Sequence, residues 1–401
     1  MKNVLLITSI YPRLDSDDNE GTPVCHYFAR DWVKLGYRVI VVHTQSVYPF
    51  FFYWLAKLFR SVIAAKTGAV VYTYRDRGTT RYEKDGVIVY RVSVFKFVPH
   101  GKYSDWTMAK LKREIVDILK ENGVVPDVAV GHFPNPQLEL LSCLKKKYGV
   151  RTCYIDHGAC DQIWTIYARS YENLFRDIDI FGFRSKPIQE RFEEMYGKRE
   201  KTFLCYSGVP ENYIQPVERV YTGVLRKFCF VGSLYKLKRV KDIVSALDKV
   251  YPNKDFTLDI VGEGQERGDL EKKVRDLSLE SVVYFHGRLP REKVQGIMKE
   301  AECFVMVSAP EAFGLVYLEA MGKGLITIGT RDQGIDGVIV DGYNGFLCDA
   351  GNVEELAGII NKINALTPAE RQAISFRAIQ TVSELTDVKA AQKYMDAVIK
   401  F

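Results

Sequence analysis

Short apolar runs alternate with polar loops along the whole chain. The first runs are residues 4–8 and 38–44, and a helical pattern over residues 26–35 lies between them. Strand, glycine-bearing loop, helix and strand in this order open a parallel doubly wound sheet. The first fifty residues therefore predict an α/β fold.

The same alternation continues to the C-terminus and divides into two series. The first series predicts further strands at residues 87–92, 126–132, 151–155 and 178–183, and it ends with residues 202–210. The second predicts strands at 228–231, 256–261, 282–285, 303–307 and 325–328. Helical spacing predicts helices at residues 106–121, 138–147, 188–196, 354–365, 369–384 and 387–401. Residues 211–226, with proline, glycine and little periodicity, are interpreted as a linker. The pattern predicts two doubly wound, Rossmann-like domains facing each other across a cleft.

Composition narrows the class of protein. The chain has 401 residues, 47% of them hydrophobic and 26% charged, which is ordinary for a soluble α/β protein of two or three domains. Its net charge of +6 permits anionic ligands or lipid surfaces and does not indicate a nucleic-acid binder. Eight scattered cysteines without a CxxC pair indicate a reducing cytoplasm. The N-terminal apolar run is too short for a signal peptide, and no apolar stretch reaches the 18 residues of a membrane span.

Residues 47–65, from Val47 to Ala65, differ from their surroundings. They are rich in Phe, Tyr, Trp and Leu at helical spacing, and their only charges, Lys57 and Arg60, are basic. Such a helix is typical of contact with a membrane interface or with a lipid acceptor. The alternative is a helix that belongs to the core.

The stretch 308–324 connects two expected strands through one helix. Glu311 precedes the helix and Glu319 lies in its second turn, so their backbones are separated by up to about 12 Å. The backbone N–H groups of Phe313, Gly314 and Leu315 lie between them at the helix start, where anions are favoured. Along the chain, the stretch thus offers a hydroxyl acceptor (Glu311), an anion site (the N–H groups) and a second hydroxyl acceptor (Glu319). A nucleotide sugar presents a hexose, a diphosphate and a ribose in this order over a similar span. The alternative is a glutamate at a helix cap and another on a solvated helix face.

Loops at the expected carboxyl ends of other strands add candidates. Gly232 and Ser233 open a loop with four basic residues, Lys236, Lys238, Arg239 and Lys241, which would neutralise a diphosphate or simply begin a charged helix. Gly262 begins a tight Gly-Glu-Gly turn. In the first series, Gly21 and His157 occupy equivalent loops and would face the others across the cleft, although a lone histidine is often structural.

These motifs, taken in order, resemble a known family. They are Gly21, Gly232-Ser-Leu with Lys238, Val261-Gly-Glu-Gly264, Ser308-x2-Glu311-x-Phe-Gly-x4-Glu319-Ala-Met-x-x-Gly324 and Asp341-Gly-x-Asn-Gly345-Phe. The chain is similar to the retaining glycosyltransferases with the E-x7-E motif, called group 1 or family four, which have the GT-B fold. The resemblance covers nearly the whole chain and is stronger in the second half.

The resemblance implies transfer of a sugar from a nucleotide-diphosphate donor with retention of anomeric configuration and without a metal or other cofactor. It implies that Glu319 binds the ribose hydroxyls and that Glu311 binds sugar hydroxyls. It assigns Lys238 to the leaving diphosphate and places His157 near the anomeric carbon.

The resemblance also implies a division of labour between the domains. Residues 1–208 would form an acceptor-binding domain, with the last helix, 387–401, packing back on it, and residues 209–386 would bind the nucleotide sugar. The remaining donor-binding residues would be Phe313, Gly314, Leu315, Gly21, Gly232, Ser233, Arg239 and Gly262.

Four positions depart from the family pattern. Ser233 stands where arginine is frequent, Arg239 where glycine usually follows the lysine, and Ser207 where asparagine is usual. Gln333 and Asp336 stand near the position of a frequent glutamate. Ser233 and Arg239 bear on the phosphate contacts.

The function expected from the sequence is a hexosyltransferase-type enzyme acting on a glycan or lipid-linked acceptor in cell-surface polysaccharide or glycolipid synthesis. It would be cytoplasmic, with peripheral contact to the inner face of the membrane through residues 47–65 left open. A catalytically inactive nucleotide-sugar-binding subunit and an epimerase or phosphorylase on the same fold are the alternatives.

Overall fold

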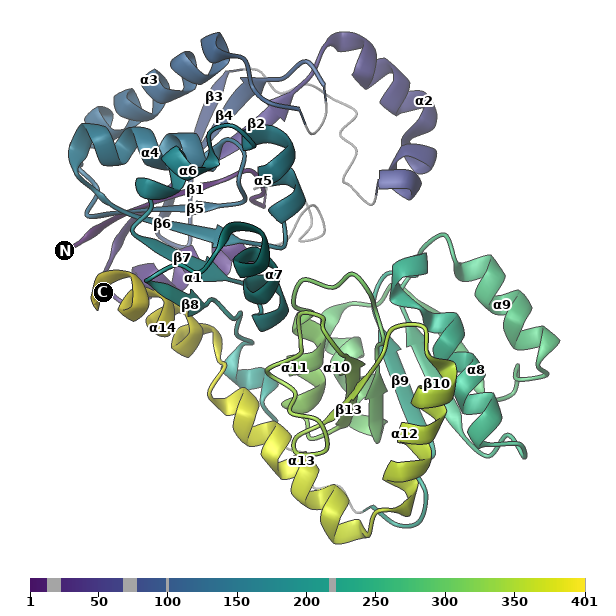
Figure 1. Ribbon diagram of the computed structural model, residues 1–401. Helices are drawn as coiled ribbons and strands as arrows, with labels where there is room; N and C mark the ends of the chain where they lie inside the picture. The colour runs from purple at the N-terminus through teal and green to yellow at the C-terminus, as the bar shows by residue number, and fades with distance from the viewer. Residues whose placement is uncertain (13–22, 68–77, 99–100, 216–220, 401) are drawn as a thin grey trace. The chain divides into compact units, whose positions relative to one another are not determined.

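The computed structural model describes residues 1–12, 23–67, 78–98, 101–215 and 221–400. The chain divides into two compact units (Figure 1). Unit 1 comprises Met1–Arg184, Gln189–Cys205 and Ala390–Phe401, and unit 2 comprises Ser185–Ile188 and Tyr206–Lys389. Each unit is built around its own sheet.

Unit 1 has an eight-stranded sheet in the order β3-β4-β2-β1-β5-β6-β7-β8. Its strands are β1 Asn3–Thr8, β2 Arg38–Val47, β3 Thr79–Lys84, β4 Val87–Phe95, β5 Val128–His132, β6 Arg151–Asp156, β7 Ile180–Phe183 and β8 Thr202–Leu204. All pairings are parallel except that of β3 with β4, which is antiparallel. The central strands β1 and β5 are buried almost throughout, as expected when helices cover both faces of a parallel sheet.

Eight helices belong wholly or mainly to unit 1. They are α1 Val24–Lys34, α2 Phe50–Thr67, α3 Asp105–Glu121, α4 Gln137–Tyr148, α5 Cys160–Tyr167, α6 Tyr171–Arg176, α7 Lys186–Tyr196 and α14 Asp387–Lys400. The C-terminal helix α14 packs on this unit through Tyr394, whose ring makes edge contacts with Phe28 and Trp32 of α1.

Unit 2 has a six-stranded, wholly parallel sheet in the order β11-β10-β9-β12-β13-β14. Its strands are β9 Lys227–Val231, β10 Thr257–Val261, β11 Val283–Gly287, β12 Cys303–Val305, β13 Ile326–Thr330 and β14 Phe346–Cys348. Its helices are α8 Val240–Val250, α9 Arg267–Asp276, α10 Arg291–Glu300, α11 Leu315–Met321, α12 Val353–Ala365 and α13 Pro368–Ser383, with short 3-10 turns η1 Glu211–Tyr213 and η2 Lys236–Lys238.

The prediction of two parallel, doubly wound α/β sheets is confirmed. Sequence reasoning missed β3, whose mostly exposed residues lack an apolar face, and it missed the three-residue strand β14. It also passed over the short helices α5 and α6. Within the stretch interpreted as a linker, Tyr221 and Leu225 are buried in the core of unit 2.

Two features that the described residues lack bear on ligands and membranes. No group of three or more His, Cys, Asp or Glu side chains lies close enough to hold a metal ion within the described ranges. In the same residues no helix is both long and apolar enough to cross a membrane.

Candidate active site

The E-x7-E stretch forms the predicted βαβ connection in unit 2. Strand β12 and strand β13 are parallel neighbours, and α11 begins at Leu315 directly after Gly314. Gly314 has a left-handed backbone with φ of 77°, and a Cβ there would lie 2.6 Å from the Tyr317 ring. Only glycine fits this bend without strain. Gly314 caps the start of α11 and Leu315 is its first residue. The backbone N–H groups of both therefore have no acceptor carbonyl within the helix.

The structure brings Lys238 and Glu311 together. The Lys238 ammonium donates to Glu311 Oε2 over 2.5 Å, and both side chains are less than one-fifth exposed. Ser308 also donates to Glu311 Oε2, over 3.1 Å. The loops that carry the two residues are linked because the Ala309 N–H donates to the Leu237 carbonyl. A cation and a hydroxyl acceptor therefore lie side by side near the start of α11.

The glycine-rich loop after β13 positions Glu311. The Glu311 N–H donates to Gln333 Oε1 over 2.8 Å, and the Gly334 N–H donates to the Glu311 carbonyl. A Cβ on Gly334 would lie 2.3 Å from backbone atoms of Ala312 and Phe313. Gln333 stands near the place of the family's frequent glutamate, and here its amide serves as an acceptor for the backbone.

Glu319 is held by α10, which sequence reasoning did not connect to the site. Arg291 donates to Glu319 Oε1 over 2.8 Å and Gln295 donates to Oε2 over 2.9 Å. The Arg291 guanidinium also lies over the Tyr213 ring. Glu319 is 8% exposed, and each carboxylate oxygen keeps a second lone pair for a ligand hydroxyl. The i, i+4 spacing of Arg291 and Gln295 on a helix is the only signal of this pairing in the sequence.

Gly262 lies so close to the Gly232 backbone that no side chain fits at position 262. The Gly262 backbone has φ of 140°, and a Cβ there would lie 1.9 Å from the Gly232 carbonyl oxygen. The Gly232 N–H donates to the Val261 carbonyl. The loops after β9 and β10 thus meet backbone to backbone at the carboxyl ends of their strands.

The basic loop separates into residues with different partners. Arg239 pairs with Asp242, and Lys241 pairs with Glu266 and Asp269, whereas Lys238 turns to Glu311. Arg239 has a left-handed backbone, with φ of 51°, which explains why a glycine is favoured at this position. Ser233 is exposed at the start of the same loop.

Phe313 is buried against Tyr206, with ring centroids 5.5 Å apart and nearly parallel planes. Burial raises the pKa of Tyr206 to about 12, so this phenol stays neutral. The stacking fixes the residue just before Gly314. The Phe313 ring is thus a structural support, and its backbone remains the part assigned to the donor.

His157 follows β6 in unit 1 and lies in a chain of neutral groups. His157 Nε2 lies 2.9 Å from His132 Nδ1, and His132 Nε2 lies 3.1 Å from the Tyr394 hydroxyl of α14. Burial lowers the pKa of His132 to about 3. Burial, then His132 and Arg184, lowers the pKa of His157 well below its ordinary value. Both imidazoles are therefore neutral at physiological pH.

Gly21, the other candidate in unit 1, lies outside the described residues.

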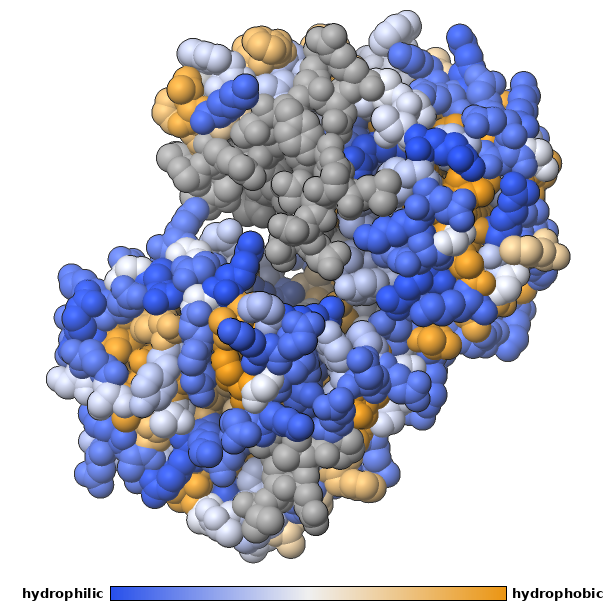
Figure 2. Space-filling view, turned by 180° about the vertical axis from the view of Figure 1, so that it is seen from behind, coloured by the Kyte–Doolittle hydropathy of each residue, from blue (hydrophilic) through white to orange (hydrophobic). Residues whose placement is uncertain are grey.

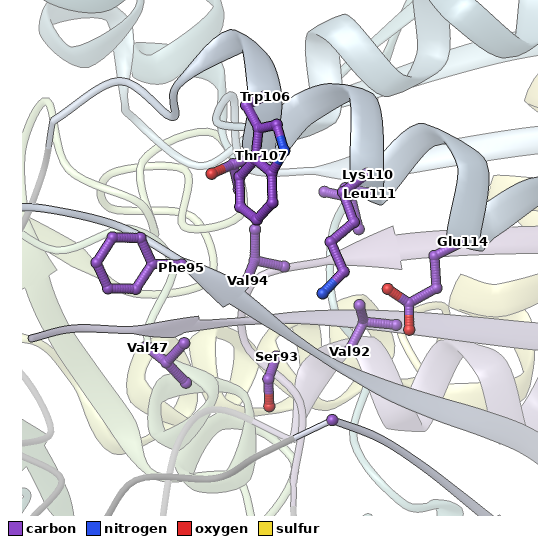
Figure 3. A pocket seen from close by; sticks show the side chains of 11 residues that line it. Val47, Val92, Ser93, Val94, Phe95, Trp106, Thr107, Lys110, Leu111 and Glu114 are labelled. Atoms are coloured by element: carbon purple, nitrogen blue, oxygen red, sulfur yellow. The ribbon is translucent and has the colours of Figure 1, made fainter.

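A hollow of about 340 Å³ lies between α3 and the C-terminal part of β4 (Figure 3). Trp106, Lys110 and Glu114 of α3 line it together with Val94 and Phe95 of β4. None of the site residues expected from the sequence lines this hollow. We assign it no role in the chemistry.

Comparison with known proteins agrees with this geometry. Residues 224–380 match the family model described as glycosyl transferases group 1. The chain is 27% identical over 286 residues to N-acetyl-alpha-D-glucosaminyl L-malate synthase of Bacillus anthracis, covering 68% of this chain and 71% of that protein. It is 27% identical over 194 residues to the lipopolysaccharide core biosynthesis glycosyltransferase LpsE of Rhizobium meliloti (strain 1021), covering 48% and 56%.

The fold is similar to that of solved glycosyltransferases. The crystal structure of Anabaena Alr3699/HepE in complex with UDP and glucose superposes with a TM-score of 0.68 and 18% identity, and the match covers 100% of both chains. The two parallel sheets thus form the GT-B fold. Residues 224–380 thus match the group 1 glycosyltransferases, the family that the motif order indicated.

Proposed function

We propose that the protein transfers a sugar from a nucleotide-diphosphate donor to a glycan or lipid-linked acceptor, with retention of anomeric configuration. The observation that carries the proposal is the Lys238–Glu311 pair beside the start of α11. It combines a cation for a leaving diphosphate with a carboxylate for sugar hydroxyls. Charge that develops on a leaving group is stabilised most by donors that are already in place.

The sugar, diphosphate and ribose of the donor bind to three successive groups of residues in unit 2. Glu311 accepts hydroxyls of the transferred sugar, and the Gly314 and Leu315 amides with Lys238 bind the diphosphate. Glu319, held by Arg291 and Gln295, accepts the ribose hydroxyls. The structural neighbour with UDP and glucose supports a uridine nucleotide and a hexose as the first donor to test.

Lys238 performs the task that a divalent metal performs in other glycosyltransferases. It brings one positive charge to the diphosphate, and the helix-start amides add partial positive charge there. Neutral His157 contributes a hydrogen bond and no charge, because burial suppresses its protonation. The reaction proposed here needs no metal and no other cofactor.

A peripheral membrane contact through α2 fits an acceptor that is lipid-linked. Phe50, Phe51, Trp54, Leu58 and Phe59 are each at least half exposed on this helix. Lys57 is exposed among them, and Arg60 follows in the sequence. Tyr53 and Ala56 are buried, so the side of the helix that carries these two residues is covered by protein. Figure 2 shows apolar side chains, in orange, at the end of unit 1 where α2 lies. Aromatic residues beside basic ones are typical of an interfacial helix.

The names of the two relatives support two kinds of acceptor for the reaction. LpsE acts in synthesis of the lipopolysaccharide core, which favours a cell-surface polysaccharide or glycolipid and a cytoplasmic enzyme at the inner membrane face. The Bacillus anthracis relative acts on L-malate, an anionic small molecule. Both kinds of acceptor use the same donor site.

Release of nucleoside diphosphate tests the proposal. The wild type is incubated with UDP-, GDP- and ADP-sugars, together with lipid extract or L-malate, and free nucleoside diphosphate is measured. Turnover of one donor that needs Glu311 supports the transferase. Binding without turnover supports the inactive subunit instead, and conversion of the donor sugar without nucleotide release supports an epimerase.

A further inference from the structure

Lys96 is a buried amine that has no opposite charge beside it among the described residues. It follows β4 directly and is 6% exposed. Its ammonium lies 4.6 Å from the centre of the Tyr103 ring. Within the described part of the chain its side chain has no hydrogen bond and no ion pair.

This environment is costly for an ammonium group. Transfer of a charged group out of water is unfavourable unless the charge is paired. Buried Asp31, by contrast, is paired with both Arg30 and Lys34. The Tyr103 ring offsets only part of the cost for Lys96, because a cation–π contact is weaker than a buried ion pair. An unpaired buried cation indicates a ligand that brings the missing charge.

Lys96 also lies where a ligand is expected. Phe95 is aligned with Val47 at the ends of the parallel strands β4 and β2, and the Lys96 N–H donates to the Val47 carbonyl over 2.8 Å. Ligands of such sheets bind beyond the carboxyl ends of the strands. Lys96 is therefore at the functional edge of unit 1, the unit to which we assign the acceptor.

Polar groups hold the surrounding loop in place. The Tyr103 hydroxyl lies 2.6 Å from the Ser46 hydroxyl of β2. The Asn135 side chain donates to the Gly101 carbonyl over 3.0 Å and accepts from Tyr167. The Tyr103 ring is thus tied to the end of β2, and its loop is tied to the segment after β5, before any ligand arrives. A fixed recognition group loses little freedom on binding.

We propose that Lys96 binds an oxyanion of the acceptor, a phosphate or carboxylate group that lies apart from the hydroxyl receiving the sugar. This inference rests on the proposed transferase function and names the acceptor's chemical class. The anion supplies the counter-charge that Lys96 lacks, and the contact orients the acceptor. Neutral sugars without such a group would bind unit 1 poorly.

The titration of Lys96 agrees with this role. Burial lowers the pKa of Lys96 from 10.5 to about 8. At pH 7 about nine-tenths of the amines are still protonated, as one pH unit below a pKa requires. A bound anion favours the charged form and raises the pKa again. The Lys96 side chain is therefore charged in the free protein and has no charged partner within the described ranges.

Calorimetric titration of the full chain with L-malate and with inorganic phosphate tests the proposal. A saturating nucleoside diphosphate occupies the donor site, so that the anions report on unit 1 alone. The variants are Lys96→Met, which keeps the aliphatic stem over Tyr103, and Lys96→Arg, which keeps the charge. Lys120→Met, an exposed lysine of α3, is the matched control, and thermal melting checks that each variant folds.

We expect at least one anion to bind the wild type, and its affinity to fall about 10- to 100-fold in Lys96→Met, since a hydrogen bond to a charged group is lost. Lys96→Arg and Lys120→Met should stay within about threefold of the wild type, because each keeps a cation at position 96. Preference for phosphate identifies a phosphorylated acceptor, and preference for malate identifies a small carboxylic acid. Should Lys96→Met unfold, Lys96→Gln takes its place.

Undiminished anion affinity in Lys96→Met overturns the inference, as does a wild type that binds neither anion. Failure of the transferase proposal gives a different result. In that case neither the wild type nor any variant releases nucleoside diphosphate from a donor sugar of the panel, whatever happens at Lys96.

Discussion

The ammonium of Lys238 lies 2.5 Å from the carboxylate of Glu311, although 73 positions separate them in the sequence. The loop after β9 carries the cation and the loop after β12 carries the anion, and these two strands are neighbours in the unit 2 sheet. In the free protein each group satisfies the other. A donor sugar diphosphate would compete for both, with its phosphates drawn to Lys238 and its hydroxyls to Glu311.

Lys238→Met should lower kcat about 100- to 1,000-fold, as loss of one preorganised donor to developing charge does in other enzymes. Lys241→Met is the matched control, because Lys241 is paired with Glu266 and Asp269 and not with Glu311. Steady-state release of nucleoside diphosphate measures both. Equal turnover in the two variants would show that Lys238 does not act on the leaving group.

Arg291→Met should raise the donor KM several-fold and change kcat little. Arg291 holds Glu319, to which we assign the ribose, and loss of a binding contact shared by ground and transition states appears in KM. Arg275→Met, an exposed arginine on the neighbouring helix α9, should behave like the wild type. A kcat effect without a KM effect in Arg291→Met would contradict the ribose assignment of Glu319.

Gly262→Ala should strongly destabilise unit 2, by more than about 2 kcal/mol, since the new Cβ would overlap the Gly232 carbonyl oxygen. Gly358→Ala is the control, because Gly358 lies inside α12 with open space around it. Alanine there should be neutral or stabilising by up to about 1 kcal/mol. Urea unfolding compares the two variants. Similar stabilities would mean that the two loops do not meet as closely as the structure shows.

Acid should weaken unit 1 through His132. The unfolded imidazole titrates near its ordinary pKa of about 6.5, whereas the folded one has a pKa of about 3 and stays neutral. Below pH 6.5 the unfolded state therefore binds the extra proton, and stability falls as pH falls. Between pH 7 and pH 5 this one group should cost about 2 kcal/mol.

Urea titrations at pH 7 and pH 5 measure this loss. His132→Asn should show a smaller drop than the wild type, while His286→Asn, a histidine of unit 2 paired with Asp259, should keep the full drop from His132. An unchanged drop in His132→Asn would show that His132 does not resist protonation in the folded state.

Polar substitution of the exposed side of α2 should abolish co-sedimentation with vesicles of anionic lipids. The triple variant Phe51→Ser, Trp54→Ser and Leu58→Ser removes large exposed apolar side chains and leaves Lys57 in place. Phe376→Ser, an exposed phenylalanine of α13, is the control. If the triple variant still co-sediments with the vesicles, these side chains do not make a membrane contact.

The sequence predicted most elements because a strand buried on both faces reads as a continuous apolar run, as in β1 and β5. It missed β3, which is exposed and stabilised by its partner β4. Local pattern carries no information on such pairing. Element bounds near the strand ends, such as β12, depend on neighbours in the same way.

The residues of the candidate site also differ in whether a local sequence pattern reveals them. Glu311, Gly314 and Glu319 were found because motif and helix start are local in the sequence. Arg291 and Gln295 were missed, and Gln333 was named without its contact to Glu311, because these contacts join separate segments. Lys96 was missed because burial of a lysine cannot be read from its neighbours in the chain.

The central claim is that unit 2 activates a nucleotide sugar through Glu311 and Lys238. The most direct measurement is release of nucleoside diphosphate from a panel of UDP-, GDP- and ADP-sugars, by the wild type and by Glu311→Gln, with lipid extract or L-malate as acceptor. The account predicts turnover of at least one donor by the wild type and a loss of about 100-fold or more in Glu311→Gln. Turnover that Glu311→Gln leaves undiminished, or a wild type that binds and turns over no donor, would contradict it.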